Sequence, residues 1–317
     1  MLDQVRARVD AAGGLAARSW LHAWFALAVV ATVVLTLVPV TPSAGVYGNG
    51  DGGSNNPGYW MVGRDGSVYT FGLAAHFGDI PSATDAPSPS PVVSMSAEPN
   101  GRGYVLLAAN GTISAFGSMT VLGSIDADLQ AGESAASVSV TPTGQGYWIF
   151  TDQGRVFAFG DAQHLGDLAA FDLAGPIVSS VPTPSGAGYF MLGSDGGVFA
   201  FGDADFFGSV PQILPGVVLD CPVVGLVPTP TGLGYWLVGC DGGVFAFGDA
   251  GFVGSIPAVL PGVTLDQPIN GMVAYGNGYL MVAFDGGVFN FATNQDFLGS
   301  LGGEVLPAPI VGVVPLG

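Results

Sequence analysis

The sequence predicts an all-β protein: a six-bladed β-propeller, closed by its C-terminal strand and preceded by one N-terminal hydrophobic helix. Three observations predict this fold. One apolar, glycine-rich phrase recurs six times along the chain, the copies follow one another at a period in the forties, and each copy divides into short strand-like pieces separated by turn residues. A period of this length, built from strand-like rather than helical pieces, is typical of propeller blades.

The six copies share a Gly-Tyr start, a central turn and an aromatic third piece. They begin at Gly58 (GYWMVGRDGSVYTFG), Gly103 (GYVLLAANGTISAFG), Gly146 (GYWIFTDQGRVFAFGDA), Gly188 (GYFMLGSDGGVFAFGDA), Gly234 (GYWLVGCDGGVFAFGDA) and Gly278 (GYLMVAFDGGVFNFA). Each copy can bury its apolar faces only against its neighbours, which is why the unit is repeated.

The first 57 residues differ from the repeats. Residues 1–19 are polar and contain arginines, as in a cytoplasmic segment or the n-region of a signal peptide, and residues 20–40 carry no formal charge with His22 neutral. That apolar run is long enough to cross a bilayer as a helix, with the arginine side cytoplasmic. A cleaved signal peptide is the alternative. Both predict an extracytoplasmic protein, membrane-anchored or secreted, with a linker at 41–57 and the propeller at 58–317.

Within one unit the sequence predicts four strands. In the fifth unit these are PVVGLVPTP from Pro222, GYWLVG from Gly234, GVFAFG from Gly243 and a short FVGSI from Phe252. The DGG between the second and third pieces is a hairpin-turn signal. Strands that are apolar on both faces suit a sheet packed between two others.

The two ends of the repeat region predict closure of the ring. The first copy starts with its second strand at Gly58, and the chain ends with a spare first strand, PIVGVVPLG, at 309–317. First strands begin at positions 91, 134, 176, 222, 268 and 309, all prolines except the serine at 134. The last of them completes the first blade and removes an exposed sheet edge.

The first strands share a small residue at one position. These residues are Ser94, Ser137, Ser179, Gly225, Gly271 and Gly312. Where six strands converge on an axis only small side chains fit, and crowding is the favoured explanation. A polar channel that holds a water or a cation is the alternative.

The repeat phrase resembles those of exported actinobacterial proteins, which carry Gly-Tyr-Trp, Asp-Gly-Gly-Val-Phe and Phe-Gly-Asp-Ala motifs and are regarded as loosely kelch-like β-propellers. The likeness covers about residues 58–317 and is strongest in the third, fourth and fifth copies. It implies association with the cell surface or envelope and brings no catalytic residues.

Cys221 and Cys240 are the only cysteines. They flank the hairpin formed by the first two strands of the fifth blade, so the strands bring them opposite each other. In an oxidising compartment this arrangement favours a disulfide. A metal site would need further soft ligands, and none are apparent.

The turns after the second strand carry an acidic or amide residue in every copy. These residues are Asp65, Asn110, Asp152, Asp195, Asp241 and Asp285. In the predicted propeller all six are expected to lie on one face. Asp before Gly is first a turn-forming pair. A face that binds calcium or another ligand is the alternative, and no other cofactor is expected. Asp161, Asp203 and Asp249, in the Phe-Gly-Asp-Ala turns, are expected on the opposite face in the same structural role.

Two histidines occupy the same phase of the repeat. His76 and His164 are each followed three residues later by an acid, Asp79 and Asp167, where other copies have serine. The spacing predicts local His–Asp hydrogen bonds on the outer strand. A catalytic dyad would need a nucleophile in reach and is disfavoured on two separate blades.

The charge of the chain limits the classes of function that are possible. After residue 20 the chain has 22 acidic residues and three arginines, which excludes nucleic-acid binding and disfavours anionic membrane surfaces. The favoured function is a non-catalytic binding or scaffold module for a glycan, a cell-wall polymer or a protein, with specificity in loops such as 83–90 and 126–133. The alternative is a carbohydrate-active hydrolase or lyase with acids at the axial mouth. Oligomeric state and metal binding are left open.

Overall fold

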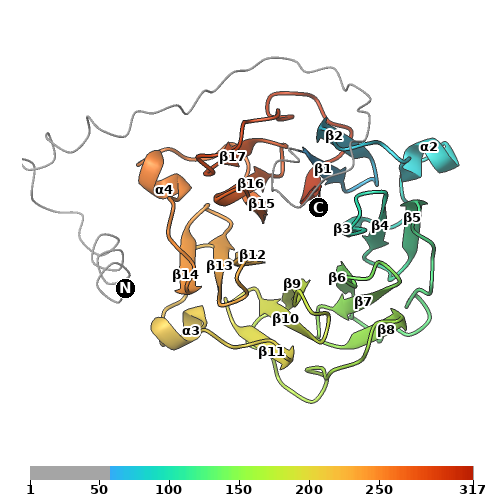
Figure 1. Ribbon diagram of the computed structural model, residues 1–317, viewed down its shortest axis with the longest axis horizontal. Coiled ribbons are helices and arrows are strands. Elements are labelled where there is room, and N and C mark those ends of the chain that lie inside the picture. Colours follow the sequence, from blue (N-terminus) through green and yellow to red (C-terminus); the bar gives the residue numbers. More distant parts are fainter. Residues whose placement is uncertain (1–57, 317) are drawn as a thin grey trace, which may run out of the picture. The chain divides into compact units, whose positions relative to one another are not determined.

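The computed structural model describes residues 58–316. They form six three-stranded antiparallel sheets, arranged around a common centre with the first strand of each sheet innermost (Figure 1). The predicted segments 1–19, 20–40 and 41–57 lie outside the described residues. Among the helices of residues 58–316, none is long and apolar enough to cross a membrane.

Each sheet is called a blade below and is numbered in chain order. Blade 1 contains β18 (Ile310–Pro315), β1 (Gly58–Gly63) and β2 (Val68–Gly72); blade 2 contains β3 (Val92–Ala97), β4 (Gly103–Ala108) and β5 (Ile113–Gly117); blade 3 contains β6 (Ala135–Val140), β7 (Gly146–Thr151) and β8 (Val156–Gly160). Blade 4 contains β9 (Ile177–Pro182), β10 (Gly188–Gly193) and β11 (Val198–Gly202); blade 5 contains β12 (Val223–Pro228), β13 (Gly234–Gly239) and β14 (Val244–Gly248); blade 6 contains β15 (Ile269–Tyr275), β16 (Gly278–Ala283) and β17 (Val288–Asn290).

The C-terminal strand β18 pairs with β1, the first strand of the described chain. Their antiparallel register runs from Tyr59 opposite Pro315 to Gly63 opposite Ile310. Blade 1 is thus built from both ends of the repeat region, as the order of the repeats predicts.

The middle strand of every blade is the core of the molecule. All six residues of each middle strand are buried. Because these strands are apolar on both faces, they pack against the neighbouring blades on either side, and buried clusters span blade boundaries: Trp236 of β13, for example, packs its ring edge against Tyr279 of β16.

The Gly-Tyr tyrosines join each blade to the one before it. Each hydroxyl donates to a glycine carbonyl in the outer segment of the preceding blade: Tyr59 to Gly299, Tyr104 to Gly78, Tyr147 to Gly123, Tyr189 to Gly166, Tyr235 to Gly208 and Tyr279 to Gly254. Gly208 shows why glycine is required there, since its φ is +133° and an added Cβ would lie 2.7 Å from the Phe247 ring.

The predicted fourth strand is wrong. FVGSI is not a strand in the structure; it is an extended segment that leads into the short helix α4 (Ile256–Val259). Two features explain this. Gly254 has a φ of +137°, outside the strand region, and Ser255 followed by a proline near the first helical position starts a helical turn.

The corresponding outer segments of blades 1 and 4 also end in short helices, α2 (Ile80–Thr84) and α3 (Val210–Ile213). In blades 1 and 2, a side chain of the outer segment accepts a hydrogen bond from the free edge of the third strand. In blade 1, Asp79 Oδ2 accepts from the Val68 N–H at 3.4 Å. The Ser124 hydroxyl accepts from the Ile113 N–H at 3.1 Å in blade 2.

Backbone hydrogen bonds link the blades at one end of the sheets. In each turn between the second and third strands, one residue accepts from the first strand of the next blade and donates to the residue that leads into its own first strand. Asp152, for example, accepts from the Ile177 N–H and donates to the Ser134 carbonyl, each at 2.9 Å. The turn residues in this pattern are Arg64, Ala109, Asp152, Ser194, Cys240 and Phe284. The six turns and the loops that enter the first strands therefore share one side of the molecule, called the loop face below.

Candidate functional site

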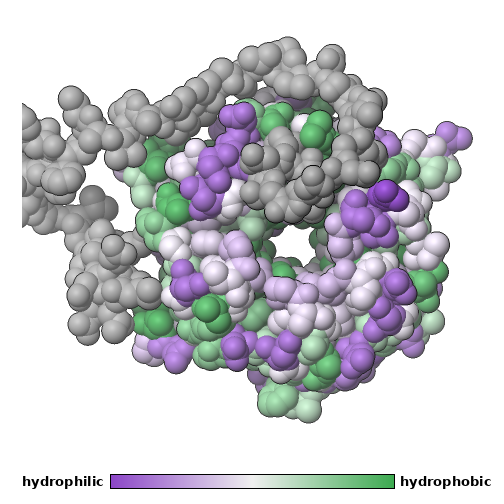
Figure 2. Space-filling model, in the orientation of Figure 1, coloured by the Kyte–Doolittle hydropathy of each residue, from purple (hydrophilic) through white to green (hydrophobic). Residues whose placement is uncertain are grey.

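A channel runs between the first strands. Its volume is about 330 Å³, and it is lined by residues of β3, β6, β9, β12, β15 and β18. Figure 2 shows an opening at the centre of the blades. The six small residues predicted at the axis, Ser94, Ser137, Ser179, Gly225, Gly271 and Gly312, all line it. Every residue that lines the channel is uncharged.

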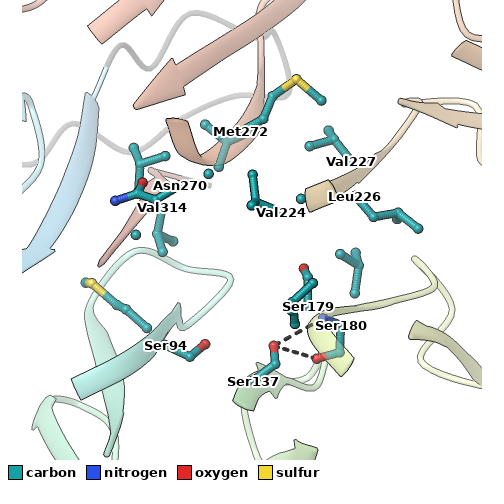
Figure 3. Close-up of a pocket in the computed structure, with 18 of the residues that line it drawn as sticks. Ser94, Ser137, Ser179, Ser180, Val224, Leu226, Val227, Asn270, Met272 and Val314 are labelled. Atoms are coloured by element: carbon teal, nitrogen blue, oxygen red, sulfur yellow. Dashed lines mark hydrogen bonds between the residues drawn. The ribbon is translucent and has the colours of Figure 1, made fainter. Parts of the chain in front are cut away.

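The two halves of the channel differ in polarity (Figure 3). On the side of blades 2 to 4, serine hydroxyls bridge adjacent first strands: Ser94 accepts from the Val138 N–H, and Ser137 accepts from the Ser180 N–H at 3.1 Å. The Ser180 hydroxyl also donates to the Ser137 hydroxyl at 2.8 Å. These bonds satisfy inner strand edges that the three-stranded sheets leave open, which gives the serines a structural role.

Asn270 is the polar residue on the other side of the channel. It stands where the equivalent bulge positions carry Val93, Ala136, Val178, Val224 and Val311. Its amide donates to the Ile310 carbonyl of blade 1, and its Oδ1 is a buried atom without a hydrogen-bond partner. Asn270 therefore ties blade 6 to β18.

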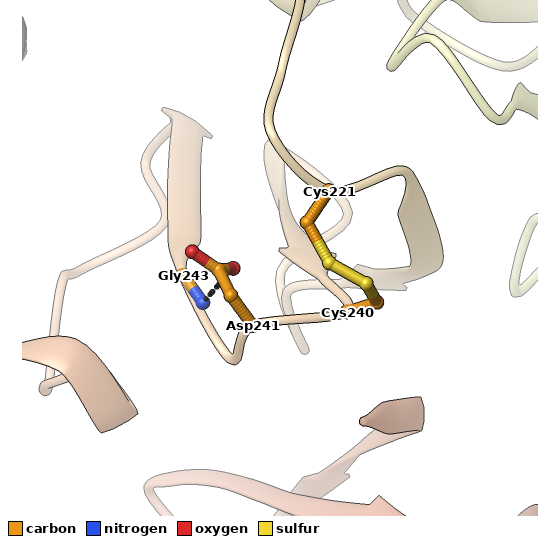
Figure 4. Close-up of a disulfide and its surroundings, with 4 residues drawn as sticks. All are labelled: Cys221, Cys240, Asp241 and Gly243. Carbon is orange, nitrogen blue, oxygen red and sulfur yellow. Dashed lines mark hydrogen bonds between the residues drawn. A yellow bond between two sulfur atoms is a disulfide. The ribbon is translucent and has the colours of Figure 1, made fainter. Parts of the chain in front are cut away.

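The aspartates of the loop-face turns bond to their own turns. The carboxylates of Asp65, Asp195, Asp241 and Asp285, and the amide oxygen of Asn110, each accept from the backbone N–H two residues later. Figure 4 shows this bond between Asp241 and Gly243. Within residues 58–316 no group of three or more His, Cys, Asp or Glu side chains is placed to hold a metal ion.

Asp152 is one residue closer to the Gly-Tyr start of its copy than the other turn aspartates are. Gln153 occupies the position of Asp65 and Asp195, whereas Asp152 occupies that of Arg64 and Ser194. Its Oδ1 accepts from the Ser134 N–H at 3.0 Å instead of closing a turn. Asp152 therefore shares its residue type with the other turn aspartates but not their structural position.

The Phe-Gly-Asp-Ala aspartates lie at the other end of the sheets. Each receives two hydroxyls from the turn that joins the first and second strands of its own blade. Asp203 accepts from Thr183 at 2.8 Å and from Ser185 at 2.5 Å. Asp161 and Asp249 form the same pair of bonds with Thr141 and Thr143 and with Thr229 and Thr231. Hydrogen bonds from Ser185 and then Thr183 lower the pKa of Asp203.

The structure brings both predicted His–Asp pairs together. His76 Nε2 lies 3.7 Å from Asp79 Oδ2, and His164 Nε2 lies 3.4 Å from Asp167 Oδ2. Asp79 also caps α2 by accepting from the Ser82 N–H at 2.9 Å. Burial raises the pKa of Asp79, but hydrogen bonds from Ser82 and Val68 and the charge of His76 outweigh it, so the net shift is downward.

Cys221 and Cys240 lie at disulfide distance, with Cα atoms 5.5 Å apart (Figure 4). The Cys240 N–H donates to the Pro222 carbonyl at 2.9 Å, which holds the two chain segments together. The pair thereby joins the end of the loop 214–221 to the loop-face turn of blade 5.

The tryptophans of the repeats are structural. Trp60, Trp148 and Trp236 are at most 6% exposed, and each indole N–H donates to a backbone carbonyl of its own blade's outer segment. Buried between blades, they offer no stacking platform for a sugar ring.

The loop face carries a feature that sequence reasoning missed. Loops that enter blades 4, 5, 6 and 1 expose large apolar side chains, called the loop crescent below: Phe171 (66% exposed), Val217 (47%), Val218 (90%), Val263 (57%) and Val305 (100%). The exposure follows from local anchoring, because a leucine just after the exposed residue packs into the core. The heptapeptide LPGVVLD at 214–220, repeated as LPGVTLD at 260–266, was the available signal.

The two loops expected to carry specificity are different in character. Residues 83–90 and 126–133 expose no large apolar side chain. Loop 126–133 is held by the buried Glu133, whose Oε2 accepts from Arg155 at 3.0 Å and from the Gln130 N–H at 2.8 Å. This ion pair orders the loop.

Comparison with known proteins supports the fold alone. No family profile matches the sequence, and no characterised protein shows significant sequence similarity to it. A chain in the crystal structure of a nidogen/laminin complex is similar with a TM-score of 0.54 at 10% identity, over 81% of this chain and 97% of that one. The β-propeller domain of Myceliophteria thermophila Cps50 (Swd1) has a TM-score of 0.44 at 13% identity, over 71% of this chain and 76% of that one. With six sheets around one centre, the chain has a β-propeller fold.

Proposed function

We propose that this protein is an exported, closed six-bladed propeller that acts as a non-catalytic binding module, and that the loop face is its binding surface. The observation that carries the proposal is the loop crescent. Soluble proteins rarely expose a run of large apolar side chains without a partner to cover them. Here the exposed positions recur on four successive loops of one face.

Closure of the ring by β18 gives the module its rigidity. It is supported by the β18–β1 pairing, by the Tyr59 hydroxyl bonded to Gly299 and by the Arg64 N–H bonded to the Pro309 carbonyl at 2.8 Å. A rigid frame holds the loops in place, so that binding orders few residues and loses little entropy.

Export is supported by the N-terminal sequence, by the resemblance to exported repeat proteins and by the cysteine pair. Disulfides persist outside the cytoplasm. The predicted place of the propeller is the cell surface or the surrounding medium, on a membrane anchor or free after cleavage.

A protein partner is favoured over a glycan. The repeated tryptophans are buried and not available for stacking, whereas the crescent offers valines and a phenylalanine, side chains suited to a protein surface. A solved structure that the fold resembles comes from a nidogen/laminin complex. The hydrolase alternative predicts carboxylates at the axial mouth, and the residues that line the channel are uncharged.

The test compares two surface variants of the full-length chain. The crescent variant carries Phe171→Ser, Val218→Ser, Val263→Ser and Val305→Ser. The rim variant carries Phe206→Ser, Phe252→Ser and Phe297→Ser, at side chains of the outer segments that are 40% to 51% exposed. Both are assayed against purified envelope proteins, wall polymers and glycans, with and without calcium.

We expect saturable binding to a protein that the crescent variant loses by more than tenfold and the rim variant retains. Equal binding by both variants would contradict the assignment of the loop face. Cleavage of a polymer would contradict the non-catalytic role, and binding to a wall polymer alone would replace the protein partner.

A further inference from the structure

Every loop of the crescent pairs its exposed apolar residue with an exposed acid. The pairs are Phe171 with Asp172, Val218 with Asp220, Val263 with Asp266 and Val305 with Glu304. In each loop the exposed apolar residue and the acid are within three residues of each other in the sequence, and each lies within two residues of the anchoring leucine. The crescent is therefore both apolar and acidic.

No basic side chain neutralises these acids within the loops. Segments 166–175, 214–222, 260–268 and 302–308 contain no lysine, arginine or histidine. Of the arginines in the described part of the chain, Arg155 is bonded to Glu133 in blade 3, and Arg102 lies in a turn between first and second strands, at the end of the sheets away from the loop face. Arg64 remains on the loop face, in blade 1.

We propose that the occupant of the crescent is a basic, apolar protein segment, in which lysines or arginines alternate with large apolar side chains. This inference rests on the proposed function and names its partner. Charge complementarity carries it: apolar contacts exclude water, while the surrounding acids attract cationic groups and repel anionic ones. Anionic wall polymers and anionic membranes are disfavoured by the same charges.

The cysteine pair holds the central loop of this surface. Cys221 directly follows Asp220 and lies three residues after Val218, and its partner Cys240 belongs to the turn that bonds to blades 5 and 6. The loop with the 90% exposed Val218 is therefore tied to the frame. Reduction of the pair would free this loop and weaken binding.

The probe is a synthetic amphipathic peptide of leucine and lysine, measured by titration calorimetry with the full-length chain at low and high salt. Two matched peptides separate the contribution of positive charge from that of apolar contact. One has every lysine replaced by glutamate, and the other has every leucine replaced by serine. Vesicles of phosphatidylcholine test a lipid surface instead of a protein.

Matched charge variants separate a specific surface from the overall negative charge of the chain. The crescent charge variant carries Asp172→Asn, Asp220→Asn and Asp266→Asn. The control carries Asp126→Asn, Asp205→Asn and Asp296→Asn, at exposed acids outside the crescent, so both variants have the same net charge.

We expect the leucine–lysine peptide to bind at least tenfold more tightly than either matched peptide, and more weakly at high salt. The crescent charge variant loses at least fivefold in affinity, and its control loses less than twofold. Equal losses in the two variants, or binding of the glutamate peptide, would overturn the inference. The proposed function is tested separately by the crescent variant defined above. If that variant loses binding to a natural protein partner, the loop face remains the binding surface even when the leucine–lysine peptide does not bind as expected. Binding to phosphatidylcholine vesicles without peptide binding would overturn the inference in favour of a lipid surface.

Discussion

The tyrosine hydroxyl of each repeat is the residue-level contact that joins the blades. A buried phenol must find a hydrogen-bond partner, and here the partner is always a glycine carbonyl of the preceding blade. The glycine is needed because the neighbouring phenylalanine ring leaves no space for a Cβ. The Gly-Tyr start of one copy and the outer-segment glycine of the preceding copy thus encode one contact from its two sides.

Removal of one such hydroxyl should weaken the fold measurably. We expect Tyr235→Phe to lower the free energy of unfolding by about 1 kcal/mol, because the Gly208 carbonyl loses its donor. Urea unfolding of the full-length chain measures it. Tyr69→Phe, at a half-buried tyrosine of β2 outside this set, is the control and should change stability by less than half as much.

The same tyrosines predict a loss of stability in alkali. Burial raises the pKa of Tyr189 to about 12, and burial also raises the pKa values of Tyr59, Tyr147 and Tyr235. Tyrosines of the unfolded chain ionise near pH 10. The stability that the buried, neutral tyrosines contribute is therefore fully present below about pH 10 and is lost as the pH rises toward their pKa in the folded chain.

A pH titration of tyrosinate absorbance, together with circular dichroism, checks this. The repeat tyrosines should ionise only as the fold is lost, and Tyr189→Phe should make the alkaline decline shallower. Ionisation of all nine tyrosines near pH 10 in a folded chain would refute the account of their burial.

At the scale of elements, the Thr-x-Thr/Ser turn and the Phe-Gly-Asp-Ala turn form one latch. Asp203 receives hydroxyls from Thr183 and Ser185 and so fixes the end of β11 against the β9–β10 turn. Because the pKa of Asp203 is lowered, its ionised carboxylate stabilises the folded chain above about pH 4. This stabilisation is lost as the pH falls below that value.

Asp203→Asn should therefore destabilise blade 4 at neutral pH by less than about 1 kcal/mol, since the carboxylate is exposed. The difference from the natural chain should shrink below about pH 4. Thermal unfolding across pH measures both values, with Asp205→Asn as the exposed control. If the difference in stability between Asp203→Asn and the natural chain grew in acid, the proposed role of the Asp203 hydrogen bonds would be contradicted.

The cysteine pair acts on the loop before β12. We expect the double variant Cys221→Ser and Cys240→Ser to unfold with about 3 kcal/mol less stability than the oxidised chain, from the entropy of the loop that the pair closes. A reducing agent should bring the natural chain to the same value and leave the variant unchanged. If the reducing agent left the stability of the natural chain unchanged, the two cysteines would not be joined by a disulfide.

Sequence reasoning located the strands because each is an apolar run bounded by turn residues. The second and third strands begin and end close to where GYWLVG and GVFAFG do. It failed where local chemistry competes with the pattern: FVGSI is apolar enough for a strand, but Gly254, the N-cap Ser255 and Pro257 in the first helical turn redirect the backbone. Exposure of the crescent was hidden for a different reason, since Val218 and the anchored Leu219 are both apolar and only packing distinguishes them.

At the scale of the whole molecule, the proposed closure of the ring depends on β18. Residues 310–315 supply the inner strand of blade 1 and contact β3 and β15 of the blades on either side. A chain that stops at residue 308 should lose cooperative unfolding and expose apolar surface, because blade 1 would keep only two strands. Addition of a peptide of residues 307–317 should restore the natural transition; a truncated chain as stable as the full one would disprove closure.

Hydrogen exchange of the full-length chain, with and without the bound leucine–lysine peptide, tests the central claim most directly. We expect slow exchange in β1 and β18 in both states, since these two strands pair with each other, and new protection on binding in loops 166–175, 214–222, 260–268 and 302–308. Fast exchange in β18, or protection confined to loops 83–90 and 126–133 or to the outer segments, would contradict it.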